Sequence, residues 1–249
     1  MSIVFSPPPL GQPDIHLPDH TQLPETDGRI VNNFNELPQS LLLTESILPR
    51  LRQIHPDGMF AIGQDCGIYF RPVDPPLEGC RAPDWFYVPD VPALSQEGIV
   101  RRSYVMWKEI VAPQLIIEYV SGDGSEERDR TPLKGKFWIY ERAIRAPFYA
   151  LHDHVTGVLE VHELIGGAYE RMKANARGHF PISPLQVELG TWTGQVANVP
   201  GIWVRFFDEI GRLLPADFER ADSAEARVAA MEAENASLRA LLTQAGANP

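Results

Sequence analysis

The chain has 249 residues, 44% of them apolar, which suits one α/β domain with appendages or at most two small domains. Its formal net charge of −11 argues against a protein that binds DNA by covering it with positive charge. No apolar run is long enough for a membrane helix, the N-terminus shows no signal-peptide pattern, and two cysteines make no disulfide framework. We therefore expect a cytoplasmic protein without a membrane partner.

Residues 1–30 are rich in Pro and Asp, which predicts an extended arm. Apolar residues recur at helical spacing over 36–54, which predicts a helix with a kink or local break at Pro49. A second helix is expected from about Leu133 to Ile144, directly after Pro132.

Short segments rich in branched or aromatic residues predict strands. They lie at 59–70, 85–88, 115–120, 148–154, 157–166, 185–189 and 202–207. In this order several strands follow one another directly, and a helix separates the third group of strands from the next. Such an order favours an α/β (α+β) fold with a mixed sheet and helices on its faces, and it argues against a fold in which strands and helices alternate throughout. We assign this domain to residues 31–215.

Residues 221–244 contain no Gly or Pro. Apolar residues and one Asn recur there in steps of four and three, which is heptad spacing. These positions are Ala224, Val228, Met231, Asn235, Leu238 and Leu242. Asn235 falls at an a position, which favours a parallel two-stranded coiled coil. We expect a homodimer through this C-terminal helix; a lone surface helix and a heteromeric partner remain open.

The dipeptide Pro-Asp occurs five times, and each copy is compatible with a turn. Asp84 leads directly into an aromatic segment, Trp85 to Val88, that is typical of a buried strand. Asp90 follows the other end of that segment and is the competing candidate.

Glu118 lies inside the strand-like segment LIIEYV, where an unpaired buried carboxylate is costly. It either faces water, pairs with a basic residue or binds a metal. Lys136 lies early on the next predicted helix, from which it can reach back over the end of the strand. Two carboxylates and a lysine are what metal-assisted phosphodiester hydrolysis needs, with Mg²⁺ as the ion that such oxygens prefer.

Three segments in this order, APDWFYVPDVP, APQLIIEYVS and KFWIYERAIRAPFYALHD, resemble the Uma-two family of the PD-(D/E)XK nuclease superfamily. The resemblance runs from roughly residue 36 to residue 207 and implies a restriction-endonuclease-like core with flanking helices. It implies that Asp84 and Glu118 are catalytic metal ligands and that Lys136 is the catalytic lysine. The metal would be Mg²⁺ or Mn²⁺.

The resemblance also adds accessory residues. Ser121 and Tyr140 match further positions of the family pattern, and Glu36 would occupy the place near the site where the first helix of the family often has a His or an acidic residue. The backbone carbonyl of Tyr119 is expected as an extra metal ligand.

Two positions depart from the family pattern. Val120 stands where the wider superfamily places its lysine. Pro132 stands where this family usually has an Asp, and whether Asp129 takes the role of that Asp is left open.

The sequence thus predicts a metal-dependent DNA endonuclease, with Arg142 and Arg145 either contacting the phosphate backbone or forming a solvated helix face. The alternative is an inactive binding or assembly module of the same fold, dimerised through the tail. His152, His154 and His162 lie on a predicted hairpin, and we expect such strand histidines to face solvent.

Overall fold

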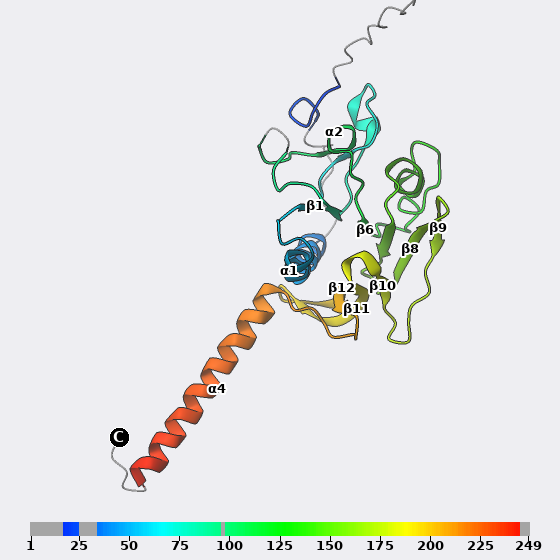
Figure 1. The fold of residues 1–249 in the computed structure, drawn as a ribbon. Coiled ribbons are helices and arrows are strands. Elements are labelled where there is room, and N and C mark those ends of the chain that lie inside the picture. Colours follow the sequence, from blue (N-terminus) through cyan, green and yellow to red (C-terminus); the bar gives the residue numbers. More distant parts are fainter. Residues whose placement is uncertain (1–16, 25–33, 96–97, 245–249) are drawn as a thin grey trace, which may run out of the picture.

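The computed structural model describes residues 17–24, 34–95 and 98–244 and is organised around a six-stranded sheet (Figure 1). Its strands, in spatial order, are β1 (Phe60–Gln64), β4 (Trp85–Pro89), β6 (Leu115–Tyr119), β7 (Phe148–His152), β8 (Leu159–Ile165) and β9 (Ala168–Arg171). β6 and β7 are parallel and all other neighbours are antiparallel. The predicted mixed sheet with flanking helices is therefore confirmed.

One face of this sheet is covered by helix α1 (Glu36–Ile54) and by a second, three-stranded sheet. Leu43, Ile47 and Leu51 of α1 are fully buried in this core and lie on one face of the helix, whereas Leu41 is exposed. The second sheet consists of β10 (Phe180–Ile182), β11 (Val187–Val196) and β12 (Val199–Asp208). α1 is one continuous helix that includes Pro49, so of the two expected effects of this proline, a kink or a local break, the break is absent.

The opposite face is covered by α3 (Lys136–Trp138), which continues without interruption into the π-helical segment η2 (Ile139–Ile144). Tyr140 and Ile144 of η2 are buried against Ile116 and Tyr149 of the sheet. The helix begins three residues later than predicted, because Leu133 has a positive φ of 64° and residues 132–135 form a turn. π-helical turns are frequent at functional sites.

Smaller elements complete the domain: η1 (Pro76–Gly79), α2 (Met106–Glu109), η3 (Ser183–Leu185) and a small sheet of β3 (Cys80–Arg81), β2 (Ile68–Tyr69) and β5 (Tyr104–Val105). Leu23 of the N-terminal arm is buried against Tyr69 and Val105, so residues 17–24 lie on the domain. The rest of the predicted arm lies outside the described residues.

The last element, α4 (Asp217–Gln244), leaves the end of the second sheet and extends away from the domain (Figure 1). Its first turn is held by Glu219, which pairs with fully buried Arg205 at 2.6 Å and accepts a hydrogen bond from the Ala216 backbone N–H. In the described part of the chain, no helix is both long and apolar enough to cross a membrane.

Candidate metal centre

The antiparallel register of β4 and β6 brings Asp84 and Glu118 to neighbouring positions. Trp85 lies opposite Ile117, so the residue before Trp85 lies beside the residue after Ile117. The Asp84 carboxylate accepts a hydrogen bond of 2.5 Å from the Tyr119 backbone N–H, which fixes it at this end of the sheet. The strands therefore bring together the two carboxylates that the sequence selected.

Glu118 is 1% exposed, so the possibility that it faces water is excluded. One carboxylate oxygen accepts a 2.5 Å hydrogen bond from the Tyr140 hydroxyl, and the other lies 3.0 Å from Lys136 Nζ. The residues predicted as lysine and accessory tyrosine thus contact the same buried carboxylate. An ion pair is present, and a role of Glu118 in metal binding stays a prediction.

The electrostatics around Asp84 and Glu118 favour binding of a cation. Burial raises the pKa of Asp84 well above its ordinary value, and the charges of Glu118 and Glu36 add to the effect. Burial also raises the pKa of Glu118, although Lys136 and the Tyr140 hydroxyl oppose the shift. Burial disfavours the charged form of Lys136, but the neighbouring carboxylates outweigh it and raise the pKa of Lys136. One lysine is therefore shared by more than one carboxylate.

Glu127 is a further member of this group that sequence reasoning missed. It is fully buried, and one of its oxygens accepts a 3.0 Å hydrogen bond from the Ser121 hydroxyl. Lys136 Nζ lies 3.7 Å from the same carboxylate, while the second oxygen has no hydrogen-bond partner among the described residues. The loop that holds Glu127 contains four acidic residues, Asp123, Glu126, Glu127 and Asp129, and spacing alone does not tell which one turns inward.

Asp129 does not substitute for the acidic residue that Pro132 replaces. Its carboxylate accepts a 2.8 Å hydrogen bond from the Thr131 backbone N–H in a local turn. Lys136 instead forms ion pairs with Glu118, Glu127 and the half-exposed Glu126. The loop therefore supplies its buried acidic partner from position 127.

Two further predictions can be compared with the geometry. Asp90, the rival of Asp84, is 79% exposed at the other end of β4, so it is not part of the buried group.

The prediction that the strand histidines face solvent is wrong for His152 and His162, which are 0% and 7% exposed. His152 Nε2 lies 3.0 Å from the Ile202 carbonyl, and the His162 ring packs edge-on against Phe137, because the second sheet and α3 cover the two faces of the sheet.

The donor set fits a hard divalent cation. Among the described residues, no three His, Cys, Asp or Glu side chains converge as a metal-ligand cluster. The candidate donors are thus two carboxylates, Asp84 and Glu118, together with main-chain oxygen and water. Mg²⁺ accepts such an arrangement, because it is commonly bound through one or two carboxylates and keeps several water ligands.

Comparison with known proteins gives the family. The profile of the Uma2 family, described as "Putative restriction endonuclease", matches residues 17–198. The chain belongs to this family. No curated protein matches it. Among solved structures, one described as a putative nuclease belonging to DUF820 from Anabaena variabilis is similar, with 12% identity, a TM-score of 0.41 and coverage of 63% of this chain and 76% of that one.

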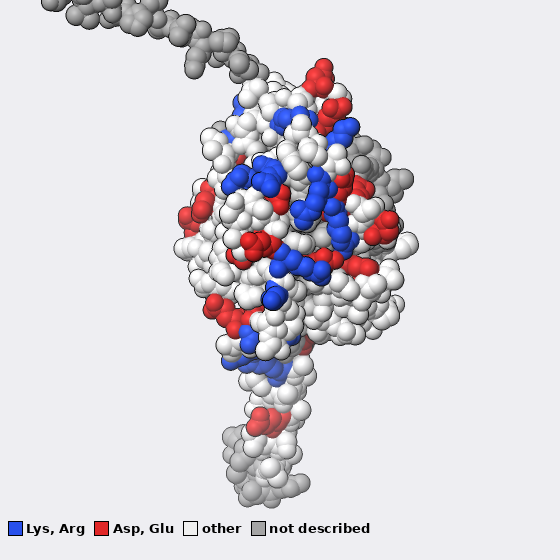
Figure 2. All heavy atoms as spheres, turned by 90° about the vertical axis from the view of Figure 1, so that its right-hand side faces the viewer, with Lys and Arg blue, Asp and Glu red and all other residues white. Residues whose placement is uncertain are grey.

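This Uma2 chain also carries a basic face. Figure 2, which looks at the side of β8 and β9, shows Lys and Arg side chains gathered across the middle of the molecule with acidic side chains between them. Ion pairs join two arginines to each of two carboxylates there: Arg128 and Arg171 to Glu160, and Arg130 and Arg142 to Glu141. Within this group of six side chains, four arginines stand against two carboxylates, so the group itself is positive although the whole chain is acidic.

The two arginines predicted to contact nucleic acid lie on or directly after η2. Arg142 is half exposed and lies 2.7 Å from Glu141, and Arg145 is exposed at the end of the helix with a φ of 61°. Contact with phosphate remains a prediction for both.

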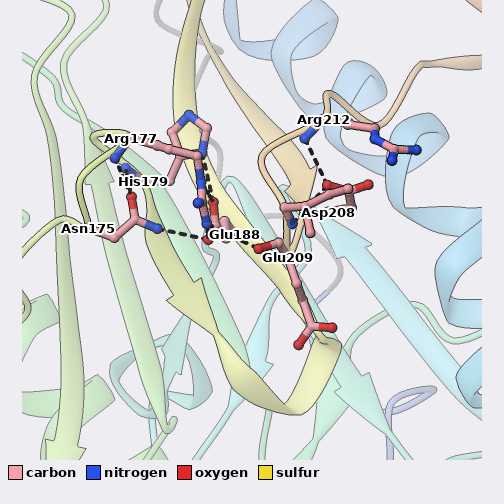
Figure 3. Close-up of polar contacts among 8 residues, drawn as sticks. Asn175, Arg177, His179, Glu188, Asp208, Glu209 and Arg212 are labelled. Carbon is pink, nitrogen blue, oxygen red and sulfur yellow. Dashed lines mark hydrogen bonds and ion pairs between the residues drawn. The ribbon is translucent and has the colours of Figure 1, made fainter.

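A second polar cluster of the Uma2 chain lies in the second sheet (Figure 3). Glu188 of β11 accepts hydrogen bonds from Asn175 Nδ2 at 2.8 Å, from His179 Nδ1 at 2.9 Å and from the Arg177 guanidinium. Hydrogen bonding to Arg177 lowers the pKa of Glu188. Since protein donors already satisfy this carboxylate, the cluster ties the loop before β10 to β11.

Proposed function

We propose that this protein is a metal-dependent endonuclease that hydrolyses phosphodiester bonds in DNA. The observation that carries the proposal is the buried pair of Asp84 and Glu118 with Lys136 beside it. Asp84, Glu118 and the Tyr119 carbonyl would hold Mg²⁺ or Mn²⁺. When bound, such an ion activates water and neutralises charge that develops on the phosphate.

The side chains of the protein would do the rest. Lys136 is a protonated ammonium in a site from which water is largely excluded, so it can hold the attacking water or a phosphate oxygen by a charge-assisted hydrogen bond. The Tyr140 hydroxyl fixes the orientation of Glu118 by donating to one of its oxygens. Glu127, 3.7 Å from Lys136 Nζ, would help to hold the ammonium in place. Each of these groups is in position before a substrate arrives, which lowers the cost of reorganisation.

DNA as the substrate is supported by the family description and by the basic face. η2, which supplies Tyr140, also carries Arg142, and Arg130 stacks 3.7 Å from the ring centre of Phe137 on α3. Arginines near the site would position the phosphate backbone without reading its sequence. Because these arginines are few, the affinity they provide should be modest, and it should fall only gradually with added salt.

The direct test is cleavage of supercoiled plasmid with Mg²⁺ or Mn²⁺. We expect wild-type protein to nick the plasmid and Asp84→Asn and Glu118→Gln to lose at least about a hundredfold in rate. Asp90→Asn is the matched control at the other end of β4, and Glu163→Gln is a control on β8, two strands away from β6 in the same sheet. If Asp84→Asn cuts as fast as Asp90→Asn, the assigned site is wrong.

Metal binding needs a readout that does not depend on cleavage. Calorimetric titration with Mn²⁺ should give binding to the wild type that Asp84→Asn and Glu118→Gln weaken and Asp90→Asn leaves unchanged. If the wild type binds double-stranded DNA but binds no metal and cuts under neither ion, the non-catalytic binding module replaces the endonuclease.

A further inference from the structure

Helix α4 presents an apolar stripe that its own domain does not cover. Every residue from 221 to 241 is exposed, and the helix points away from the two sheets (Figure 1). Val228, Met231 and Leu238 are 55%, 61% and 51% exposed, and their heptad spacing puts them on one side of the helix. A long helix with no tertiary contacts is marginal in water, and an apolar stripe along it is typical of an interaction surface.

We propose that this stripe pairs with the same stripe of a second copy of the chain, as a parallel and in-register two-stranded coiled coil. The inference concerns assembly and does not depend on the proposed nuclease activity. The heptad spacing predicts that this helix pairs with another helix. The charged residues beside the stripe indicate which helix the partner is and in which direction it runs.

The charges flank the stripe in a self-complementary pattern. With Val228 and Asn235 at a positions, Arg227 and Glu234 take g positions and Glu232 and Arg239 take e positions. In a parallel pair, each g residue faces the e residue five positions later on the other helix. Arg227 then faces the partner's Glu232, and Glu234 faces the partner's Arg239. Both contacts join opposite charges, and the two-fold axis repeats each of them.

The antiparallel alignment that centres the two stripes on each other is disfavoured by the same residues. An alignment that stacks Met231 on the partner's Asn235 brings Glu232 next to the partner's Glu232 and Glu234 next to the partner's Glu234. It also buries an Asn amide against a thioether that cannot satisfy it. In the parallel pair, the two Asn235 amides meet at the axis and bond to each other, which fixes the register.

The direction has a structural consequence, because the first turn of α4 is fixed to the domain. Glu219 bonds to Arg205 and to the Ala216 N–H, and Arg220 donates to the Glu45 carbonyl. A parallel coiled coil therefore sets the two domains side by side at the same end of the stalk. An antiparallel one would place them at opposite ends.

The test begins with the mass of the full-length protein in solution, measured by light scattering and sedimentation equilibrium. We expect two chains for the wild type and one chain for Met231→Asp. Ala233→Asp, on the outer side of the same helix, is the matched control and should stay dimeric. A monomeric wild type at about 10 μM overturns the proposal, and so does a Met231→Asp variant that remains fully dimeric.

Charge reversal and cross-linking test the direction. Arg227→Glu should weaken the dimer by roughly tenfold, because two attractive contacts become repulsive, and adding Glu232→Arg should restore it. In a chain with Cys66→Ser and Cys80→Ser, Val228→Cys should form an interchain disulfide under mild oxidation, and the outward Ala233→Cys should not. Failure of the double charge reversal to restore the dimer, together with no cross-link at position 228, would exclude the parallel pair.

Discussion

The Lys136 ammonium lies 3.0 Å from the Glu118 carboxylate, although one residue begins the helix on the outer face and the other lies in a central strand. This contact neutralises Glu118 but leaves Asp84 with only partial compensation for its charge. Once Asp84 is ionised, the group therefore carries excess negative charge in a poorly solvated place. An arrangement of this kind costs stability and is suited to holding a cation.

Replacing the lysine should stop the proposed reaction. We expect Lys136→Gln to lower kcat for plasmid nicking by about 10² to 10³-fold, because the neutral amide no longer stabilises charge on the phosphate. Lys134→Gln is the matched control, since that residue is exposed on the turn two positions earlier. Equal rates for the two variants would remove Lys136 from the catalytic group.

The raised pKa of Asp84 predicts a stability that falls with pH. Burial and the charge of Glu118 hold this pKa well above the ordinary value of 3.8, so the folded chain keeps its proton to higher pH than the unfolded chain. The stabilisation is complete below the unfolded pKa and is lost as the pH rises through the higher, folded-state pKa.

Asp84→Asn removes this penalty, and its amide oxygen can still accept from the Tyr119 N–H. Without divalent ions at about pH 8, we expect the free energy of unfolding of the variant to be about 1–2 kcal/mol larger than that of the wild type. The difference should vanish near pH 4, and Asp90→Asn should show none. Urea unfolding at the two pH values measures it, and an Asp84→Asn variant that is less stable at the higher pH would contradict the assignment.

Much of this site follows from the sequence because strand pairing is regular. The aromatic segment after Asp84 and the apolar segment around Glu118 each predict a buried strand, and adjacent pairing places the two carboxylates together. Lys136 and Tyr140 are four positions apart on one helical face, so both can reach Glu118.

The remainder depends on tertiary contacts that no local pattern encodes. Glu127 lies in a loop without periodicity, and the burial of His152 depends on a second sheet that returns from residues 180–208. The strand β9 was not predicted, because its four residues are too short to show alternation. Self-pairing of the C-terminal heptads is a property of two chains and stays a prediction.

Glu127 should act as a positioning residue for Lys136. We expect Glu127→Gln to lower kcat by about tenfold with little change in KM, because the ammonium loses a charged neighbour while the DNA-binding face is unchanged. Glu126→Gln removes a half-exposed carboxylate at 3.8 Å from the same ammonium and should have a smaller effect. A change in KM alone, or equal losses for the two variants, would speak against the positioning role.

The anchor of α4 should matter for the stability of the domain itself. Arg205 is fully buried, and Glu219 is the carboxylate that satisfies it, through contacts of 3.0 and 2.6 Å. Glu219→Ala leaves this guanidinium buried without its partner and removes the acceptor for the Ala216 N–H, so we expect a loss of about 3 kcal/mol in urea unfolding. Glu225→Ala, exposed two turns further along the same helix, should change stability by less than about 0.5 kcal/mol. Adding Arg205→Leu to Glu219→Ala should recover part of the loss, because the unpaired charge is gone. If the double variant is no more stable than Glu219→Ala alone, the ion pair is not what holds the helix to the domain.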